Sequence, residues 1–279
     1  MGMKGMLFRP TLLLLSASID DPPPVAPDVA ALAADSAGGI VAVGTFSAAG
    51  SVPVERVARW DGGAWAPVPG TADPSVVLAS AAGDGLGNVY VGGTFGTIGG
   101  VGASNVARWD GSAWTGLAGG TNGHVSSLAV GAGSLLYAAG PCTMAGGAAA
   151  ASVARWNGTA WTPLGGGWPG STLVTASGSD VYACCAVVVG AGGAGMGVGR
   201  WNGSAWSLVG DPFDQTPATL AVAPDGSLVA GGAFESVGGS AASHVARWDG
   251  ALWSGLGTGT DGAVRALAFD TYGRLYAAG

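Results

Sequence analysis

Residues 106–114 read VARWDGSAW, and closely similar nine-residue stretches begin at 57, 153, 198 and 245. The first tryptophans of the five copies are spaced by 49, 47, 45 and 47 residues. A motif that recurs at a nearly fixed period of this size is typical of proteins built from one structural unit per copy. The spacing of this motif therefore sets the unit of the fold.

Each unit contains four short apolar segments. Ahead of the third VARW lie VSSLAV at 125 and YAAGPC at 137, and the motif itself supplies two more segments around its tryptophans. We label the four A to D. All have the length and composition of strands, with Gly, Asp, Asn or Pro between them, and no segment keeps a helical period. Four-stranded units repeated about every 47 residues predict an all-β fold, a β-propeller of five full repeats plus a half repeat at the C-terminus.

The Asp-Gly pair inside the motif favours a tight hairpin between segments C and D. A two-residue type I′ turn needs positive φ at both central residues, which Asp-Gly and Asn-Gly adopt readily. With 110–111 as that turn, Trp109 pairs with Ser112 and Ala107 pairs with Trp114. Because side chains alternate faces along a strand, both tryptophans are then expected on one face, with the preceding arginine on the other.

We assign a packing role to the repeated tryptophans and arginines, because a ligand site seldom appears five times around a ring. The set is Trp60, Trp65, Trp109, Trp114, Trp156, Trp161, Trp201, Trp206, Trp248 and Trp253, with Arg59, Arg108, Arg155, Arg200 and Arg247. The tryptophans are expected to pack one blade on the next. The arginines are expected to form inter-blade hydrogen bonds or to stack on tryptophan.

The order of features within a unit resembles the kelch and galactose-oxidase type of propeller repeat. The glycine pair 92–93, the Trp-Asp pair 109–110 and Trp114 carry the pattern, which covers nearly all of 29–279. The sequence departs from it in a shorter C–D turn and in the cysteine pair 184–185, which replaces the glycine pair. WD-type repeats have a similar period, but they usually carry a Gly-His pair in each blade, and this chain has two histidines in all.

The same resemblance implies, for an oxidase of the galactose-oxidase kind, copper held by two histidines and tyrosines with a tyrosine cross-linked to cysteine. His124 and His244 fall in different units, away from any such constellation. They also form no Ser/His/Asp set with a nucleophile. We therefore expect no metal, no cofactor and no catalytic residue in these 279 residues.

Composition narrows the class of protein further. The formal net charge is −7 and Lys4 is the single lysine, so a phosphate-binding surface and a nucleic-acid partner are not expected. The 54 glycines and 15 prolines would suit a disordered chain, but 11 tryptophans argue for a packed one. Cys142, Cys184 and Cys185 are odd in number and partly adjacent, which favours small buried fillers over a disulfide framework.

The N-terminus resembles a secretory signal. Residues 1–18 combine a basic start, a short apolar run and small residues suited to cleavage, and 19–28 form an acidic, Pro-rich linker before the propeller at 29–279. A secreted, periplasmic or cell-surface location follows. Residues 181–199 are uncharged and long enough to cross a membrane, but they align with segment B and the B–C loop of every other unit, so no membrane span is expected in the mature chain.

Function is expected in the loops that vary between copies. The A–B and C–D turns are short and uniform and share one rim, whereas the B–C and D–A loops share the other rim and differ from unit to unit. The second set of loops holds the residues that fall outside the repeat pattern, which are Glu55, Arg56, Asp73, His124, Trp168, Asp211, Phe213, Asp214, Glu235 and His244. Trp168 and Phe213 occupy D–A loops of successive units. An exposed pair of these rings, with Asp211 and Asp214 beside them, would stack on and hydrogen-bond a sugar or a peptide. The alternative is that Trp168 caps the core beneath it.

The leading hypothesis is a non-catalytic, secreted or cell-surface propeller that binds a protein or carbohydrate ligand through its variable rim. Two alternatives stay open. One is a secreted oxidase-like or lyase-like propeller enzyme with catalytic groups in missing blades, and the other is a structural spacer of a larger surface protein. Because the sixth unit stops at Gly279 after two segments, we expect a truncated form of a propeller with six or seven blades.

Overall fold

The computed structural model describes residues 28–279, except positions 37, 72, 74, 166–170, 172, 190–192 and 271. Side chains are described in this part of the chain except at 173, 185–189 and 193–195. The expected signal peptide, all but the last residue of the expected linker, and Trp168 lie outside the described residues.

Five antiparallel sheets of four strands each follow one another along the chain. Blade 1 is β1 (Val29–Ala34), β2 (Ile40–Gly44), β5 (Val57–Trp60) and β6 (Trp65–Pro67); blade 2 is β7 (Val77–Gly83), β8 (Val89–Thr94), β11 (Val106–Trp109) and β12 (Trp114–Gly116); blade 3 is β13 (Ser127–Val130), β14 (Leu136–Ala139), β17 (Val153–Trp156) and β18 (Trp161–Pro163). Blade 4 is β19 (Leu173–Ser177), β20 (Asp180–Val189), β21 (Gly193–Trp201) and β22 (Trp206–Leu208); blade 5 is β23 (Pro217–Val222), β24 (Leu228–Gly232), β27 (Val245–Trp248) and β28 (Trp253–Gly255). A sixth, two-stranded sheet, the half-blade, contains β29 (Ala266–Phe269) and β30 (Leu275–Ala278).

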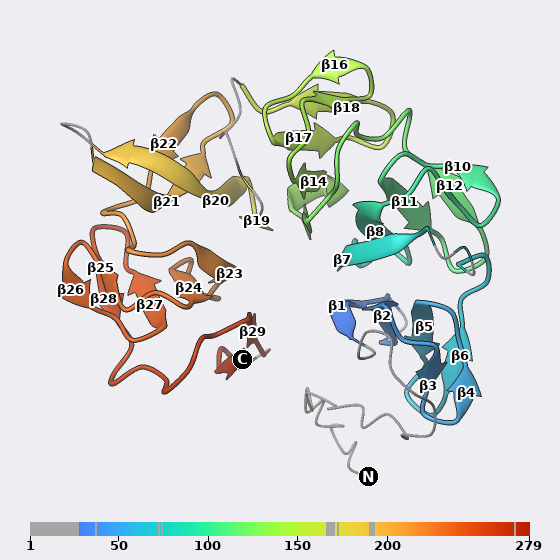
Figure 1. The fold of residues 1–279 in the computed structure, drawn as a ribbon, viewed down its shortest axis with the longest axis horizontal. Helices are drawn as coiled ribbons and strands as arrows, with labels where there is room; N and C mark the ends of the chain where they lie inside the picture. The colour runs from blue at the N-terminus through green and yellow to red at the C-terminus, as the bar shows by residue number, and fades with distance from the viewer. Residues whose placement is uncertain are drawn as a thin grey trace, which may run out of the picture.

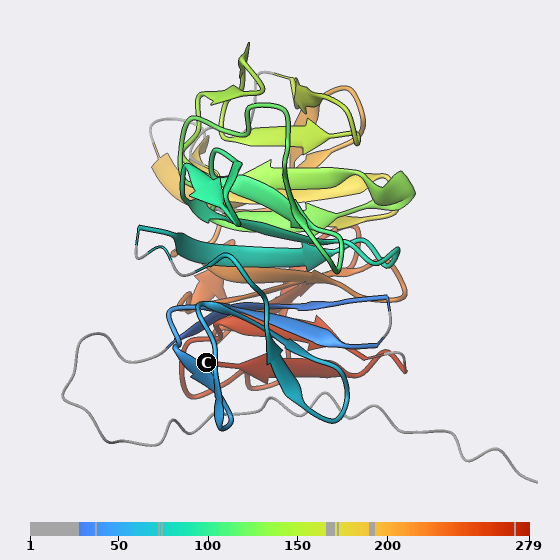
Figure 2. The ribbon, with the colours of Figure 1, turned by 90° about the vertical axis from the view of Figure 1, so that its right-hand side faces the viewer.

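The sheets are arranged around a central axis, with β1, β7, β19, β23 and β29 nearest to it (Figure 1). These first strands, together with β13, contact one another in chain order from β1 to β29. Seen from the side, the connections between strands collect on two opposite edges of the ring (Figure 2). The chain therefore folds as an all-β propeller, as the period of the VARW motif predicted.

The hairpin between strands C and D differs from the expected turn. In blade 2 the two tryptophans pair directly with each other. The backbone N–H of Asp110 donates to the carbonyl of Ala113 at 3.2 Å, so Gly111 and Ser112 form the tip. Of these residues only Gly111 has a positive φ, 96°. The type I′ prediction is wrong by one residue, because the Asp110 side chain accepts the backbone N–H groups of Ser112 and Ala113 at 2.9 and 2.8 Å and closes the turn itself.

The same hydrogen bonds set the charge state of this turn. The N–H of Ala113, and then the hydroxyl and N–H of Ser112, hold the pKa of the exposed Asp110 carboxylate at about 2. In blade 3 the amide oxygen of Asn157 accepts the equivalent backbone N–H groups at 2.9 and 2.8 Å. Aspartate and asparagine are thus interchangeable in geometry here, and only aspartate makes the turn sensitive to acid.

Each tryptophan pair lies on one face of its blade, with ring centroids between 5.3 and 5.8 Å apart. The second indole of the pair then reaches into the preceding blade. Its Nε1 donates to the carbonyl of Pro69 from Trp114, of Leu117 from Trp161, of Leu164 from Trp206 and of Val209 from Trp253, at 2.7 to 3.0 Å. One ring system therefore packs a blade and hydrogen-bonds it to its neighbour.

The repeated arginines lie on the opposite face, and where they bind acids they do so within one blade. Arg59 pairs with Asp35 at 2.6 Å, Arg200 with Asp180 at 2.9 Å, and Arg247 with Asp225 at 2.5 Å. Asp35 and Asp225 lie in the turn between the first two strands of their blades, and Asp180 is the first residue after that turn. These three ion pairs lie within one blade and not between blades, because strand C is the direct neighbour of strand B and its arginine reaches the end of that strand where the turn lies.

Blades 1, 2, 3 and 5 carry a small two-stranded ribbon in the B–C connection. The ribbons are β3 (Ala48–Ala49) with β4 (Val52–Pro53), β9 (Thr97–Ile98) with β10 (Val101–Gly102), β15 (Met144–Ala145) with β16 (Ala148–Ala149), and β25 (Ser236–Val237) with β26 (Ser240–Ala241). In blade 4 the connection is replaced by lengthened strands, since β20 and β21 pair from Val181 out to Val189. The uncharged stretch 181–199 is therefore part of a β-hairpin.

Candidate functional site

The residue immediately before strand C has the same unusual backbone in four blades. Arg56, Asn105, Ser152 and His244 have φ values of 62°, 65°, 67° and 74°. Each donates its backbone N–H to the carbonyl of the equivalent residue in the B–C connection, for example Asn105 to Phe95 and His244 to Phe234, both at 2.8 Å. A positive φ costs a non-glycine residue free energy, so four different polar side chains are held at one strained position.

Two of these side chains form hydrogen bonds to the D–A connection that leads to the next blade. Arg56 Nη1 donates to the carbonyl of Thr71 at 3.2 Å, and Asn105 Nδ2 donates to the carbonyl of Thr121 at 2.8 Å. Asn105 Oδ1 also accepts the N–H of Phe95 at 3.1 Å. The strained position therefore sits where the B–C connection of one blade meets the D–A connection that leads to the next.

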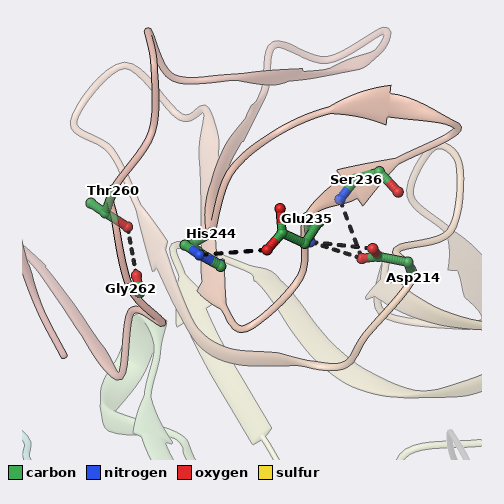
Figure 3. A network of polar contacts seen from close by, with 6 residues as sticks. All are labelled: Asp214, Glu235, Ser236, His244, Thr260 and Gly262. Atoms are coloured by element: carbon green, nitrogen blue, oxygen red, sulfur yellow. Dashed lines mark hydrogen bonds and ion pairs between the residues drawn. The ribbon is translucent and has the colours of Figure 1, made fainter.

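His244 is different from these two, as Figure 3 shows. Its side chain is 14% exposed, and its Nε2 lies 3.9 Å from the carboxylate of Glu235, which is 71% exposed. Its Nδ1 is buried and has no hydrogen-bond partner among the described residues. The backbone N–H of Thr260, in the connection to the half-blade, donates to the carbonyl of Ser243 at 3.0 Å. The imidazole is thus oriented by the scaffold with unused hydrogen-bonding capacity.

Asp214 fixes the acidic partner of this histidine. Its carboxylate accepts the backbone N–H of Glu235 at 3.1 and 3.3 Å and that of Ser236 at 3.3 Å. This holds the start of the β25–β26 ribbon against the D–A connection from blade 4 (Figure 3). We call Asp214, Glu235 and His244 the His244 corner. It brings residues from two connections together on the variable rim.

The structure separates the four predicted ligand residues. Asp214 belongs to the His244 corner, and Asp211 is exposed beside the turn of the β25–β26 ribbon, where a Cβ on Gly238 would meet its side chain. Phe213 is 1% exposed, so the expectation of an exposed ring is wrong. Trp168, its expected stacking partner, lies outside the described residues.

Phe213 is buried because it joins three elements. Its backbone exchanges hydrogen bonds with Met196 of β21 at 2.7 and 3.2 Å, and it bridges Val237 of β25. Its ring packs edge-on against Phe234 and Trp253, with centroids 4.8 and 5.0 Å away. The ring anchors the D–A connection, and that anchor presents Asp211 and Asp214 on either side.

The electrostatic balance of this part of the rim is negative. Asp211, Asp214 and Glu235 are exposed, and Asp261 lies between Thr260 and Gly262 in the connection drawn beside His244 in Figure 3. Arg265 follows that connection. In the part of the chain that the structure describes, no group of three or more His, Cys, Asp or Glu side chains is placed to hold a metal ion. The arrangement suits the recognition of a cation or a hydrogen-bond donor.

The second histidine is in another part of the ring. His124, in the connection to blade 3, has its Nδ1 2.7 Å from the Thr94 hydroxyl. Cys142 and Cys184 are buried, and burial raises the pKa of the Cys142 thiol. Sequence reasoning singled out Arg56, His124, Glu235 and His244 as departures from the repeat but missed the shared backbone strain. The signal was present, since every copy varies at the residue before strand C.

A family model described as "Domain of unknown function (DUF5122) beta-propeller" matches residues 223–248, which include strands β24 and β27 of blade 5. No curated protein matches the chain. The matched segment covers part of one copy of the repeat, from the A–B turn to the first tryptophan of the hairpin, and leaves out β23 and β28. It agrees with the class of protein that the topology defines.

Three solved structures share this class of fold. "YCF48 bound to D1 peptide" matches with a TM-score of 0.55 at 14% identity, over 92% of this chain and 77% of that one. A gluconolactonase from Xanthomonas campestris matches with a TM-score of 0.51 at 14% identity, over 89% and 82%. The extracellular domain of a hybrid two component system from B. thetaiotaomicron matches with a TM-score of 0.54 at 11% identity, over 90% of this chain and 37% of that one. At these identities the likeness shows the propeller fold alone.

Among the described residues, no helix combines the length and apolar character that crossing a membrane requires.

Proposed function

We propose that this chain is a non-catalytic, secreted or cell-surface β-propeller that binds a protein ligand through its B–C and D–A rim, with the His244 corner at the centre of the contact. The observation that carries the proposal is the strained position before strand C. A scaffold that only had to fold would favour glycine there, because glycine adopts positive φ without steric cost. Four polar side chains are kept instead, and strained residues of this kind cluster at functional sites.

His244 is the member of the set that has most left to offer a ligand. Arg56 and Asn105 spend their side chains on carbonyls of the next connection. The imidazole of His244 is oriented, mostly buried and close to an exposed carboxylate. Binding sites on a rigid scaffold are usually formed by polar side chains in the loops that the scaffold positions.

The acidic surroundings indicate the chemistry of the ligand. Asp211, Asp214 and Glu235 present carboxylates on adjoining connections, and a lysine or arginine side chain is the protein group that pairs best with them. We therefore expect a basic segment of a polypeptide to bind here. The fold neighbour YCF48, which is bound to a D1 peptide, is consistent with a peptide-binding propeller. The expected secretion rests on the N-terminal pattern, and the relation to kelch-type repeats stays a prediction.

The test is an array of short peptides that differ only in charge, probed with the purified chain and followed by titration of the best binder. We expect basic peptides to be selected and their affinity to fall as salt rises. Glu235→Gln should weaken that peptide by about fivefold or more, because it removes the exposed charge beside His244.

Glu55→Gln is the matched control, since it makes the same change on the same rim in blade 1 and should leave the affinity unaltered. Equal losses for both variants would reduce the effect to general charge and remove the His244 corner from the site. Selection of glycans but not peptides on a parallel glycan array would contradict the protein ligand and favour carbohydrate.

A further inference from the structure

The strand C arginine of blade 3, Arg155, lacks the acidic partner that its equivalents have in three other blades. In blades 1, 4 and 5 an aspartate in or beside the A–B turn binds this arginine at 2.5 to 2.9 Å. The A–B turn of blade 3 reads GAGSL at 131–135 and contains no acid, and the hairpin tip after Arg155 carries the uncharged Asn157. Blade 3 therefore keeps the arginine of the repeat without the carboxylate.

The neighbouring blade leaves little room for an acid in this turn. Gly131 holds the place that Asp35 has in blade 1, because the backbone N–H of each donates to the carbonyl four residues later at 2.9 Å. A Cβ on Gly131 would lie 3.0 Å from Cε2 of Tyr137 and 3.2 Å from Cβ of Ala176 in blade 4. The packing of blade 4 on the turn therefore disfavours an aspartate at position 131.

The charge of Arg155 is also isolated along the chain. Between Asp110 and Asp180 it is the single Asp, Glu, Lys or Arg of the sequence. Asp180 accepts both of its hydrogen bonds from Arg200 Nη2, at 3.0 and 2.9 Å. The ion pairs of the described residues do not include Arg155. In a chain of net charge −7, this positive charge has no local compensation.

The guanidinium of Arg155 is partly withdrawn from water. The residue is half-buried, and its Nε is buried with no hydrogen-bond partner among the described residues. In blades 1 and 5 the equivalent Nε donates to Asp35 at 2.6 Å and to Ser227 at 3.0 Å. Burial raises the pKa of Tyr137, and the charge of Arg155 and a hydrogen bond between the two side chains offset part of that rise. A partly desolvated cation gains more from a carboxylate than a fully hydrated one does.

Blade 2 contains a similar arginine that does have acids nearby. Arg108 Nε is buried without a partner among the described residues, but Asp84 lies in the A–B turn of that blade and Asp110 at its hairpin tip. The hydrogen bond from Ala113 contributes most to the low pKa of Asp110, and the charge of Arg108 adds to it. An acid at the hairpin tip is thus within electrostatic reach of the strand C arginine, and blade 3 has Asn157 in that place.

We propose that the A–B rim of blade 3 is a second binding site, where Arg155 pairs with an aspartate or glutamate side chain of a partner polypeptide. The partner's carboxylate takes the part that Asp35, Asp180 and Asp225 play in blades 1, 4 and 5. Those carboxylates are presented by turns, and a turn of another chain presents the same group. The site lies on the rim opposite the His244 corner and selects the opposite charge.

The test is an array of short peptides that contain one or two aspartates, each beside a copy with asparagine in place of aspartate. The best binder is then titrated into the full chain. We expect aspartate peptides to be selected over their asparagine copies and to shift the Nε–H resonance of Arg155. Arg155→Gln should lower the affinity by at least about tenfold. Selection of no aspartate peptide, or unchanged affinity in Arg155→Gln, would overturn the proposal.

Asn157→Asp tests the site while the arginine stays in place. Aspartate accepts the same turn hydrogen bonds and puts a competing carboxylate beside Arg155, so the affinity should fall by about threefold or more. Asn202→Asp is the matched control, since it makes the same change in blade 4, where Asp180 already binds Arg200. The control should bind as the parent does, and equal losses for the two variants would refute the site.

Free succinate is the remaining arm of the experiment. Displacement of the peptide by succinate at equal concentration would assign Arg155 to a small carboxylic acid and contradict the polypeptide partner. Basic peptides should bind to the His244 corner equally well in Arg155→Gln and in the parent, so the two proposed sites are tested separately.

Discussion

The junction between blades 2 and 3 and the junction between blade 5 and the half-blade are built from equivalent positions and end differently. In the first, Trp156 lies among Tyr90, Leu117 and Leu136 and is 6% exposed. In the second, the equivalent apolar residues Val229, Leu256 and Leu275 line a cavity of about 340 Å³. The closed junction shows that both blades contribute to one packing site, because Tyr90 and Leu117 come from the copy before Trp156, whereas Leu136 comes from its own blade.

The rim above these two junctions repeats the contrast. At the closed junction Asn105 hydrogen-bonds both Phe95 and the connection at Thr121. At the open junction His244 has the same backbone and a buried Nδ1 with no partner among the described residues. Asn105 therefore holds the next connection through its side chain, whereas the His244 Nδ1 makes no equivalent bond among the described residues.

The largest expected effect comes from removing the tryptophan at the closed junction between blades 2 and 3. Trp156→Ala should lower the free energy of unfolding by about 3–5 kcal/mol, because it removes a buried ring and leaves a cavity. Trp65→Ala, at a half-buried tryptophan of blade 1, should cost only about 1 kcal/mol. Urea denaturation of both variants measures the difference, and equal losses would show that the junctions do not depend on a walled tryptophan.

An effect of intermediate size is expected when the rim residues Asn105 and His244 are each replaced by the other. His244→Asn should raise stability by about 1 kcal/mol, since an asparagine amide can make the bonds beside Phe234 and Thr260 that Asn105 makes at its own junction. Asn105→His should lower it by a similar amount, because those bonds are lost and a strained histidine is left.

Thermal unfolding of the two single variants gives both values, and ligand affinity should fall for His244→Asn only. A loss of stability in His244→Asn, or a gain in Asn105→His, would contradict the view that the junction at His244 is less stable than it could be.

The smallest expected effect is a difference in acid sensitivity between the C–D hairpin of blade 5 and that of blade 3. In blade 5 the backbone N–H groups of Leu252 and Ala251 lower the pKa of Asp249, whereas blade 3 has Asn157 at that position. A lowered pKa stabilises the fold above the unfolded value of 3.8, and this contribution is lost as pH falls through the folded value. Amide exchange at 249–253 should therefore speed up relative to 157–161 as the pH falls below 3.8, and the two should keep a constant ratio above it.

Asp249→Asn should abolish this difference between the two hairpins, because asparagine accepts the same bonds without titrating. A difference that survives the substitution would have to arise elsewhere in blade 5.

Much of the ring could be predicted from the period of one motif. The four strands per repeat, the five full copies with a half copy, and the shared face of each tryptophan pair all follow from spacing and alternation. The turn could not be placed, because the side chain of Asp110 competes with the backbone for the closing hydrogen bonds. Nor could the partner of Arg59, since the separation of Arg59 and Asp35 along the chain does not show that β5 pairs with β2 beside the turn that carries Asp35.

The candidate site depended more heavily on the tertiary structure. The sequence marked Asp214, Glu235 and His244 as residues outside the repeat, but their meeting needs two connections from neighbouring blades to converge. Phe213 is expected from the sequence to be an exposed ring in a loop, but it is buried in a junction between blades. A phenylalanine ring is apolar in both environments, so the residue type alone does not distinguish an exposed binding residue from a buried one.

The sequence by itself therefore determined the repeat unit, its strands and the number of copies present, because these depend on local propensity and on a periodic pattern. Only the tertiary structure decided which residues share a junction and which backbone positions are strained. Those properties arise between blades, where side chains separated by about 45 residues meet. The VARW motif supplies the tryptophans of each junction, and the preceding copy supplies residues that they contact.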